Sequence, residues 1–368
     1  MTSAKKASFA CWSCGAKAAL TNDSSFRCQQ AGCSQRCRLT APLLAYTPLF
    51  HSKKGGAEPD YKELVRLSFL MGNKVSNDQA VHLYRSAEQT VEAAAHRVKL
   101  VYPKLRLCLA WTEKVHADGM RYEHDLVEID SARMCGQKSG RLGSAARNTT
   151  NKGRTLVLLG RFARRWMIRG LADRVTQRGC GPESKEEVSG TVKKALGKRT
   201  ILCGDGARAW GGAAAAAGKA HLSGVAHNKR IFTPVARLRK TSLNHSTQSW
   251  LKSKSSSSSG SAKPVQETAR DFKFVAGDQL AESAFGAVKK TARRMNVVGA
   301  GCKTLNGPSV IAHSSAALVR APGLHGVLKA LKAFREEACA NGDIKLSPSM
   351  AFDAAKHSWL QGEDMAKE

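Results

Sequence analysis

The sequence predicts an α/β fold, because two short apolar segments each end at an aspartate and a later helical segment carries a glutamate. Two acids at strand ends beside a third acid on a helix are typical of metal-dependent phosphoryl chemistry. The three pairs are strand Leu126–Ile129 with Asp130, strand Thr200–Cys203 with Asp205, and helix 277–290 with Glu282.

The composition indicates a globular protein with a polyanionic partner. The chain has 368 residues, of which 42% are hydrophobic, which is enough for two or three domains with a sizeable core. Lysine and arginine number 59 against 29 acids, a net charge of +30 that is spread along the chain. Such a field favours DNA or RNA as a partner, and a ribosome-type or merely basic protein is the alternative.

The cysteines and the N-terminus bear on the compartment. The chain has 11 cysteines, no apolar signal segment at its start, and no apolar run near the ~20 residues that span a bilayer. We therefore expect a protein that is not secreted, in a reducing compartment where clustered cysteines bind metal. The location would be nuclear in a eukaryote and the cytoplasm or nucleoid otherwise.

Residues 1–45 predict a structural zinc ribbon. Two cysteine pairs separated by 13 residues match two knuckles that close a tetrahedral four-thiolate site, with Gly15 and Gly32 at the tight turns. Cys37 could substitute for one member of the second pair. Free thiols in a disordered leader are the alternative. The predicted zinc ligands are Cys11, Cys14, Cys28 and Cys33.

A polar linker at residues 46–60 leads into a helical region at residues 60–105. Its first helical segment covers residues 61–71. Two Ser-x-x-Gln segments, which begin at Ser76 and Ser86, match the capping box that opens a helix.

The last of these helices is expected to end before Pro103. A short helix, a tight turn and a longer helix predict a helix-turn-helix, whose last helix would enter the major groove of DNA. An ordinary three-helix bundle is the alternative, because capping boxes mark helix starts and not DNA contacts. The candidate DNA contacts are Gln89, Thr90, His96 and Arg97.

Residues 120–340 are predicted to form the α/β domain. Three strands, a helix and a fourth strand that ends in an acid follow the order of a ribonuclease-H-like mixed sheet flanked by helices. A basic serine-rich insert at 252–264 is expected to be a disordered loop, and residues 341–368 form a weakly patterned tail. The predicted elements are strands 126–129, 155–159 and 166–170, helix 185–196, strand 200–203, helical run 213–217, strand 221–227, and helices 277–290 and 327–340.

The acids could hold Mg²⁺ or Mn²⁺, since such ions prefer oxygen ligands on rigid elements. Asp278, four residues before Glu282, and Gln279 could replace or supplement that glutamate. The alternative is that these are ordinary turn and helix-surface residues. Basic residues that follow on the same helix would suit phosphates: Lys289, Lys290, Arg293 and Arg294.

Five short motifs occur in order along residues 8–340: Phe26–Cys33 followed by Thr47–Phe50, Val127–Asp130, Asp205-Gly206 with Trp210, Val225–His227 followed by Ile231-Phe232, and Gln279–Ser283 with Lys289. In this order they resemble motifs of the DDE transposases of the Merlin type and their bacterial insertion-sequence relatives. Each motif is short, and their order is the specific feature.

The resemblance implies a zinc ribbon, a helix-turn-helix and a ribonuclease-H-like catalytic domain. It implies cleavage of double-stranded DNA at terminal inverted repeats and joining of the ends to a target, with Mg²⁺ or Mn²⁺, by at least a dimer. By position, Asp130, Asp205 and Glu282 would be the catalytic metal ligands.

The chain departs from the family pattern at several places. Ser131 stands where an acid usually follows the first aspartate, and Gln279 stands where asparagine is common. The serine-rich insert lengthens the gap before Glu282, and Cys37 is extra. Three hypotheses follow: an active transposase, a transposase-derived protein that binds DNA without cutting it, and a basic RNA-associated protein.

Overall fold

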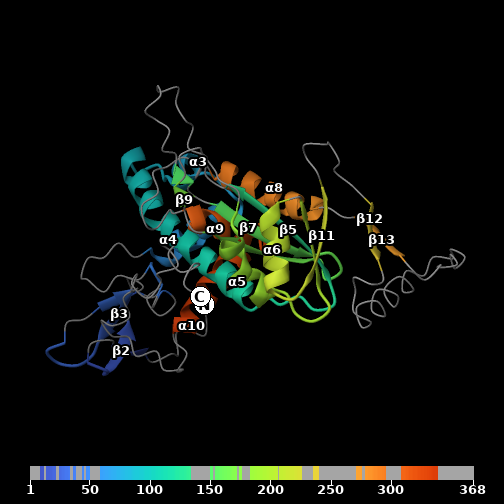
Figure 1. Ribbon diagram of the computed structural model, residues 1–368. Helices are drawn as coiled ribbons and strands as arrows, with labels where there is room; N and C mark the ends of the chain where they lie inside the picture. The colour runs from blue at the N-terminus through green and yellow to red at the C-terminus, as the bar shows by residue number, and fades with distance from the viewer. Residues whose placement is uncertain are drawn as a thin grey trace, which may run out of the picture. The chain divides into compact units, whose positions relative to one another are not determined.

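The computed structural model of the chain (Figure 1) divides into two compact units, residues 1–113 with 290–361 and residues 114–289 with 362–368. Each unit is described by itself. Within the described part of the chain, no helix is long and apolar enough to cross a membrane. The structure describes residues 9–11, 14–21, 25–33, 36–38, 44, 47–49, 59–133, 150–151, 154–171, 174–175, 183–205, 207–225, 235–239, 271–275, 278–295 and 308–338.

A mixed sheet of five strands in the order β11-β10-β5-β7-β8 forms the centre of the unit around residues 114–289. Strand β10 is parallel to β5 and β11, whereas β7 is antiparallel to β5 and β8. This arrangement confirms the predicted α/β class and the antiparallel start. The strands are β5 (Leu126–Arg133), β7 (Arg154–Gly160), β8 (Arg165–Gly170), β10 (Ile201–Asp205) and β11 (Ala220–Val225).

The two faces of β5 carry different chemistry, because successive side chains of a strand point to opposite faces. Val127 and Ile129 lie on one face, in an apolar core with side chains of α5 (Lys185–Ala195) and α6 (Arg208–Ala216). The other face of β5 carries acids, since its alternate residues are Glu128 and Asp130. The apolar face of β5 therefore packs in the core, and the opposite face carries the acids that are considered as a candidate site.

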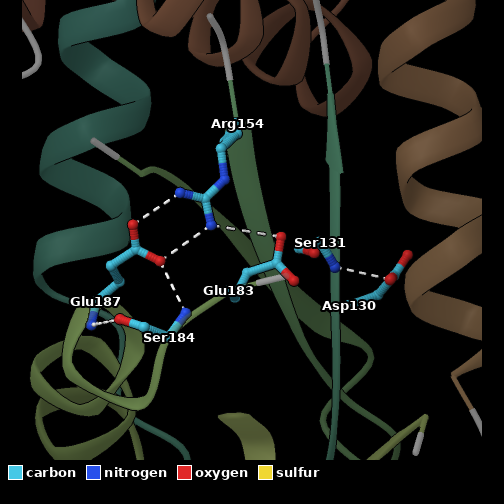
Figure 2. A network of polar contacts seen from close by, with 6 residues as sticks. All are labelled: Asp130, Ser131, Arg154, Glu183, Ser184 and Glu187. Carbon is cyan, nitrogen blue, oxygen red and sulfur yellow. Dashed lines mark hydrogen bonds and ion pairs between the residues drawn. The ribbon is translucent and has the colours of Figure 1, made fainter. Parts of the chain in front are cut away.

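A partly buried polar network ties the start of α5 to β7 (Figure 2). The guanidinium of Arg154, which is 3% exposed, donates to both carboxylate oxygens of Glu187 at 2.7 and 3.0 Å. Ser184 and Glu187 form a reciprocal capping box at the helix start. Figure 2 shows the carboxylate of Asp130 pointing away from this network.

Two predicted boundaries in this unit were wrong. Strand β5 does not end at Asp130 but continues to Arg133, because β7 pairs with it through that residue. Helix α6 begins at Arg208 and contains the two glycines that we expected before it. The second of these, Gly212, has no side chain to separate α6 from Lys185 of α5, and an added Cβ would lie 3.1 Å from that lysine.

Two short antiparallel pairs in this unit were not predicted. They are β6 (Thr150–Asn151) with β9 (Arg174–Val175), and β12 (Val235–Arg239) with β13 (Asp271–Val275). Helix α8 (Gln279–Arg294) matches the predicted helix that carries Glu282. The serine-rich insert at 252–264 lies outside the described residues.

The other unit contains helices from both ends of the chain. Helix α10 packs closely on α2, and Gly72 meets the backbone of Gly323 so tightly that any side chain there would clash. Glu113, which is 2% exposed, forms a two-point ion pair with Arg320. The helices are α2 (Tyr61–Gly72), α3 (Asn77–Tyr84), α4 (Val91–Asp118, which leaves the unit after Glu113), α9 (Pro308–Arg320) and α10 (Gly323–Ala338).

Two predictions for these helices were wrong, and one helix was not predicted. Helix α4 does not end before Pro103, because Leu105 and Leu107 of the following turn are buried and offset the cost of about 3 kcal/mol for an internal proline. It begins at Val91 and not near Ser86, because the hydroxyl of Thr90 accepts the Ala93 amide at 3.1 Å. Helix α9 was missed, since its alanines and serines gave no clear apolar period.

The predicted cap at Ser76 is confirmed, since its hydroxyl accepts the Gln79 amide at 3.2 Å. The predicted helix 327–340 corresponds to α10, whose start is four residues earlier. Helices α9 and α10 group with the N-terminal helices and not with the sheet, so the compact units differ from our boundary at residues 120–340. The tail at 341–368 lies outside the described residues.

The cysteine-rich segment forms a four-stranded antiparallel sheet in the order β1-β2-β3-β4. Phe26 and Ala18 are buried in it. The strands are β1 (Phe9–Ala10), β2 (Lys17–Leu20), β3 (Ser25–Cys28) and β4 (Arg36–Arg38).

Candidate functional site

The four predicted zinc ligands lie together. The Sγ atoms of Cys11 and Cys33 are 3.8 Å apart, those of Cys14 and Cys28 are 3.4 Å apart, and all four lie within 4.8 Å of one another. Four thiolates at this spacing could hold one zinc ion in a closed tetrahedral site. Such a site is structural, because it leaves zinc no open position.

Backbone turns support each half of this cluster. Gly15 and Gly32 have φ angles of 74° and 81°, the left-handed conformation that favours glycine, as the sequence predicted. The Gln30 amide donates to the Sγ of Cys28 at 3.4 Å, which is the hydrogen bond that a metal-bound thiolate would accept. Cys37 lies on β4 opposite Phe26, and its side chain is outside the described residues.

The acidic site begins at the parallel pair of β5 and β10. The register aligns Leu126 with Ile201 and Glu128 with Cys203. Two residues further along these strands come Asp130 and Asp205, so the two aspartates leave the pair at the same end. Asp130 is partly buried and its Oδ1 accepts the Ser131 amide at 2.7 Å.

Glu128 brings the start of α8 to the same face. This carboxylate is 1% exposed, and its Oε2 accepts the amides of Leu280 and Ala281 at 2.8 and 3.0 Å. Its Oε1 accepts the Arg161 Nε at 2.6 Å. These bonds satisfy two of the free amides at the helix start, and the next residue along α8 is Glu282.

The charge environment of Asp130 includes three other acids. Burial and, to a smaller extent, the carboxylates of Asp278, Glu282 and Asp205 raise the pKa of Asp130 to about 7, although the hydrogen bond from the Ser131 amide lowers it. Among the described residues, the four cysteines form a group close enough to share one ion, whereas these acids do not.

Asp205 is held by residues that follow it. Its Oδ1 accepts the Trp210 Nε1 at 2.6 Å and the Ala207 amide at 3.0 Å. The tryptophan is 1% exposed in the core below the sheet, so it fixes the carboxylate from the apolar side. Burial lowers the pKa of His221 on the adjacent β11, and the charge of Asp205 partly opposes that effect. Gly206 lies outside the described residues.

Comparison with known proteins gave no relative. The sequence matches no family model and no curated protein, and no solved structure was found to match.

Some of the predicted DNA contacts at the start of α4 have structural roles, and others are exposed. Arg97 of α4 donates to both carboxylate oxygens of Glu63 on α2. Glu63 also accepts a hydrogen bond from the Tyr84 hydroxyl of α3 at 3.0 Å, so this carboxylate joins the three helices. Thr90 is the cap of α4, and Gln89 is half-buried. His96 is exposed. DNA contact by these residues stays a prediction.

Three of the four predicted phosphate-binding residues of α8 are exposed. Lys290, Arg293 and Arg294 are exposed, and Lys289 lies over the ring of Phe285 at 5.5 Å. The opposite side of the helix is apolar and buried, at Ala281, Phe285, Val288 and Ala292. One helix therefore presents an acid in its first turn and a basic surface in its later turns.

Sequence reasoning missed Glu128 and Arg161 as parts of the site. An acid at a position enclosed by the apolar residues of β5 is a usable signal, because a carboxylate is rarely fully buried unless it is paired. Nothing in the sequence indicates Arg161 as its partner, since the ion pair joins positions 33 residues apart.

We expect Glu128→Gln to loosen the start of α8. It removes a buried charge that holds two helix amides and leaves Arg161 without this ion pair, which should cost about 3 kcal/mol. Hydrogen exchange of the Leu280 and Ala281 amides should speed up, whereas Glu123→Gln, at an exposed acid, should leave it unchanged. Equal exchange in both variants would show that Glu128 does not hold the helix.

The raised pKa of Asp130 predicts a pH-dependent stability in magnesium-free buffer. The folded state holds this proton up to a pH of about 7, whereas the unfolded chain loses it near the ordinary aspartate pKa of 3.8. The stabilisation of the folded state by protonation of Asp130 is therefore complete below pH 3.8 and is lost as the pH rises through about 7. From about pH 5 to pH 7, the free energy of unfolding of the wild type should fall by about 2 kcal/mol relative to that of Asp130→Asn. Urea unfolding at several pH values measures this difference, and a difference that stays constant with pH would contradict the prediction.

Proposed function

We propose that the chain is a DDE-type, transposase-derived enzyme that cleaves and transfers DNA strands with Mg²⁺ or Mn²⁺. The observation that carries the proposal is the convergence of Asp130, Asp205 and the start of α8 at one end of the β5–β10 pair. Carboxylate oxygens on rigid elements are the donors that these ions prefer.

The sheet order supports a ribonuclease-H-like assignment for this unit. An antiparallel β5-β7-β8 set followed by α5 and the parallel strand β10 follows the order expected from the sequence. In this proposal Asp130, Asp205 and Glu282 bind the metal, and Asp278, which is 3% exposed, supplements them. When bound, the metal supplies an activated hydroxyl and stabilises the leaving oxygen.

The remaining features support double-stranded DNA as the partner. The chain carries a net charge of +30, a cysteine cluster of the zinc-ribbon type and an exposed basic surface on α8. Phosphate contacts of this kind give affinity without reading sequence. A homodimer would let two DNA ends be held together, and the compartment would be that of the DNA.

A second candidate function is DNA binding without cleavage. Ser131 and Gln279, which differ from the resembled family pattern, favour it. This form predicts salt-dependent DNA binding that Asp130→Asn leaves unimpaired.

The test is a strand-cleavage assay on DNA that carries the flanking ends of the protein's own genetic element. The purified, zinc-loaded chain is incubated with that DNA in the presence of Mg²⁺, Mn²⁺ or neither ion. Metal-dependent nicking at the ends is the expected result. Tight binding with no nicking in any metal would reject the enzyme and favour the second candidate.

A further inference from the structure

The end of the sheet opposite to the acidic site has an unusual set of basic residues. It consists of the β7–β8 turn, residues 161–164, and the loop before β10, residues 197–200. Both lie where β5 begins, because Gly160 pairs with Val127 and Ile201 pairs with Leu126. Asp130 is four residues further along β5, or about 13 Å away.

Exposed positive charge is concentrated in these two loops, which we call the basic end. Four exposed basic residues lie in these loops or directly beside them, and none of the four forms an ion pair within the described part of the chain: Arg164, Arg165, Lys198 and Arg199. The acids nearby are engaged otherwise. Glu123 pairs with Arg121 at 3.0 Å, and Glu128 pairs with Arg161.

The backbone presents these charges in a conformation that is costly for them. Arg164 and Arg199 have φ angles of 52° and 54°, and His124, between them in the fold, has 53°. A left-handed conformation costs a side-chain-bearing residue about 1–2 kcal/mol, and glycine or asparagine would fit better. Strain of this kind concentrates at functional sites.

Hydrogen bonds hold both loops rigidly. Asp125, which is 2% exposed, accepts the amides of Phe162 and Ala163 at 2.9 and 3.2 Å, and an added side chain at Gly160 would clash with it. The Thr200 hydroxyl lies 3.0 Å from the Tyr122 carbonyl. The basic end is therefore fixed before any partner binds, which reduces the entropy cost of binding.

We propose that the basic end is a second binding surface for duplex DNA, separate from the acidic site. Strands β7 and β10 flank β5, so their two loops lie about 10 Å apart, a spacing at which both arginines reach the backbone of one duplex. Phe162, which is 44% exposed at the turn, adds an aromatic contact beside them. The surface would hold a duplex while the acidic site acts on another segment.

The test places a photo-crosslinking phenylalanine analogue at the turn of the full chain. Phe162→p-benzoylphenylalanine should crosslink a labelled DNA duplex several-fold more than the same analogue at Val115, which is 41% exposed. Adding Arg164→Asn with Arg199→Asn should remove most of that crosslink, since asparagine keeps the backbone conformation. The double substitution should also reduce the slope of the logarithm of the binding constant against the logarithm of the salt concentration by about 2, because two phosphate contacts are lost.

The matched control removes two charges elsewhere, with Lys329→Gln and Lys332→Gln on α10, and should leave the Phe162 crosslink unchanged. Equal crosslinking at positions 162 and 115, or a crosslink that survives the arginine changes, would overturn the proposal. More efficient displacement by duplex RNA than by duplex DNA would overturn the DNA assignment. The assay needs no added magnesium, so its outcome is independent of whether the chain cleaves DNA.

Discussion

Asp130→Asn should reduce metal-dependent strand cleavage on the order of 10³-fold or more. The substitution keeps the shape of the side chain but removes the charge of Asp130, whose pKa is raised in part by the carboxylates of Asp278, Glu282 and Asp205. Loss of one electrostatic contact in a preorganised site costs about 10²–10³ in rate, and loss of a metal ligand should cost more. DNA affinity should be unchanged or slightly higher, because a negative charge is removed.

The control for this prediction is Glu336→Gln, which removes an exposed acid from α10. It should cleave at the wild-type rate. Thermal unfolding of both variants should show that the fold is retained. Cleavage by Asp130→Asn within about tenfold of the wild type would remove this residue from the proposed metal site.

Removal of zinc should unfold the cysteine-rich sheet. Structural zinc contributes about 10–16 kcal/mol of binding free energy in small domains, and few of the described side chains in β1 to β4 are both apolar and buried. Cys14→Ser should weaken zinc binding by at least about 100-fold. Losing a residue that only hydrogen-bonds to a metal ligand costs about 10–100-fold in affinity, and the loss of a ligand should cost more. Zinc content by mass spectrometry under native conditions measures this directly.

Cys37→Ser provides the matched control, because Cys11, Cys14, Cys28 and Cys33 already form a complete tetrahedral set. This variant should keep one zinc ion per chain. Loss of zinc in Cys37→Ser with retention in Cys14→Ser would show that the ligand set differs from the one in the structure.

The strands and helices that carry the acids were predictable because each has a regular apolar period. Strand β10 and helices α5 and α8 lie close to their predicted positions. The cysteine cluster was predictable for another reason, since thiolate pairs and glycine turns are local features. Both are cases in which neighbouring residues determine the structure.

The errors arose where distant residues determine the structure. Strand β5 passes Asp130 because β7 pairs with it, and α4 passes Pro103 because the residues beyond it are buried. Glu128, an acid within an apolar strand, is a local signal of a buried and paired carboxylate, but its partners include amides about 150 positions away. The local pattern does not identify those partners.

Counting bound Mn²⁺ by electron paramagnetic resonance is the most direct test of the central claim, that the acids around Asp130 form a divalent-metal site. The zinc-loaded wild type should bind Mn²⁺ saturably, and Mg²⁺ should compete for it. Asp130→Asn should lose that binding, whereas Glu336→Gln should retain it. Equal Mn²⁺ binding by wild type and Asp130→Asn, or none by either, would contradict the metal site.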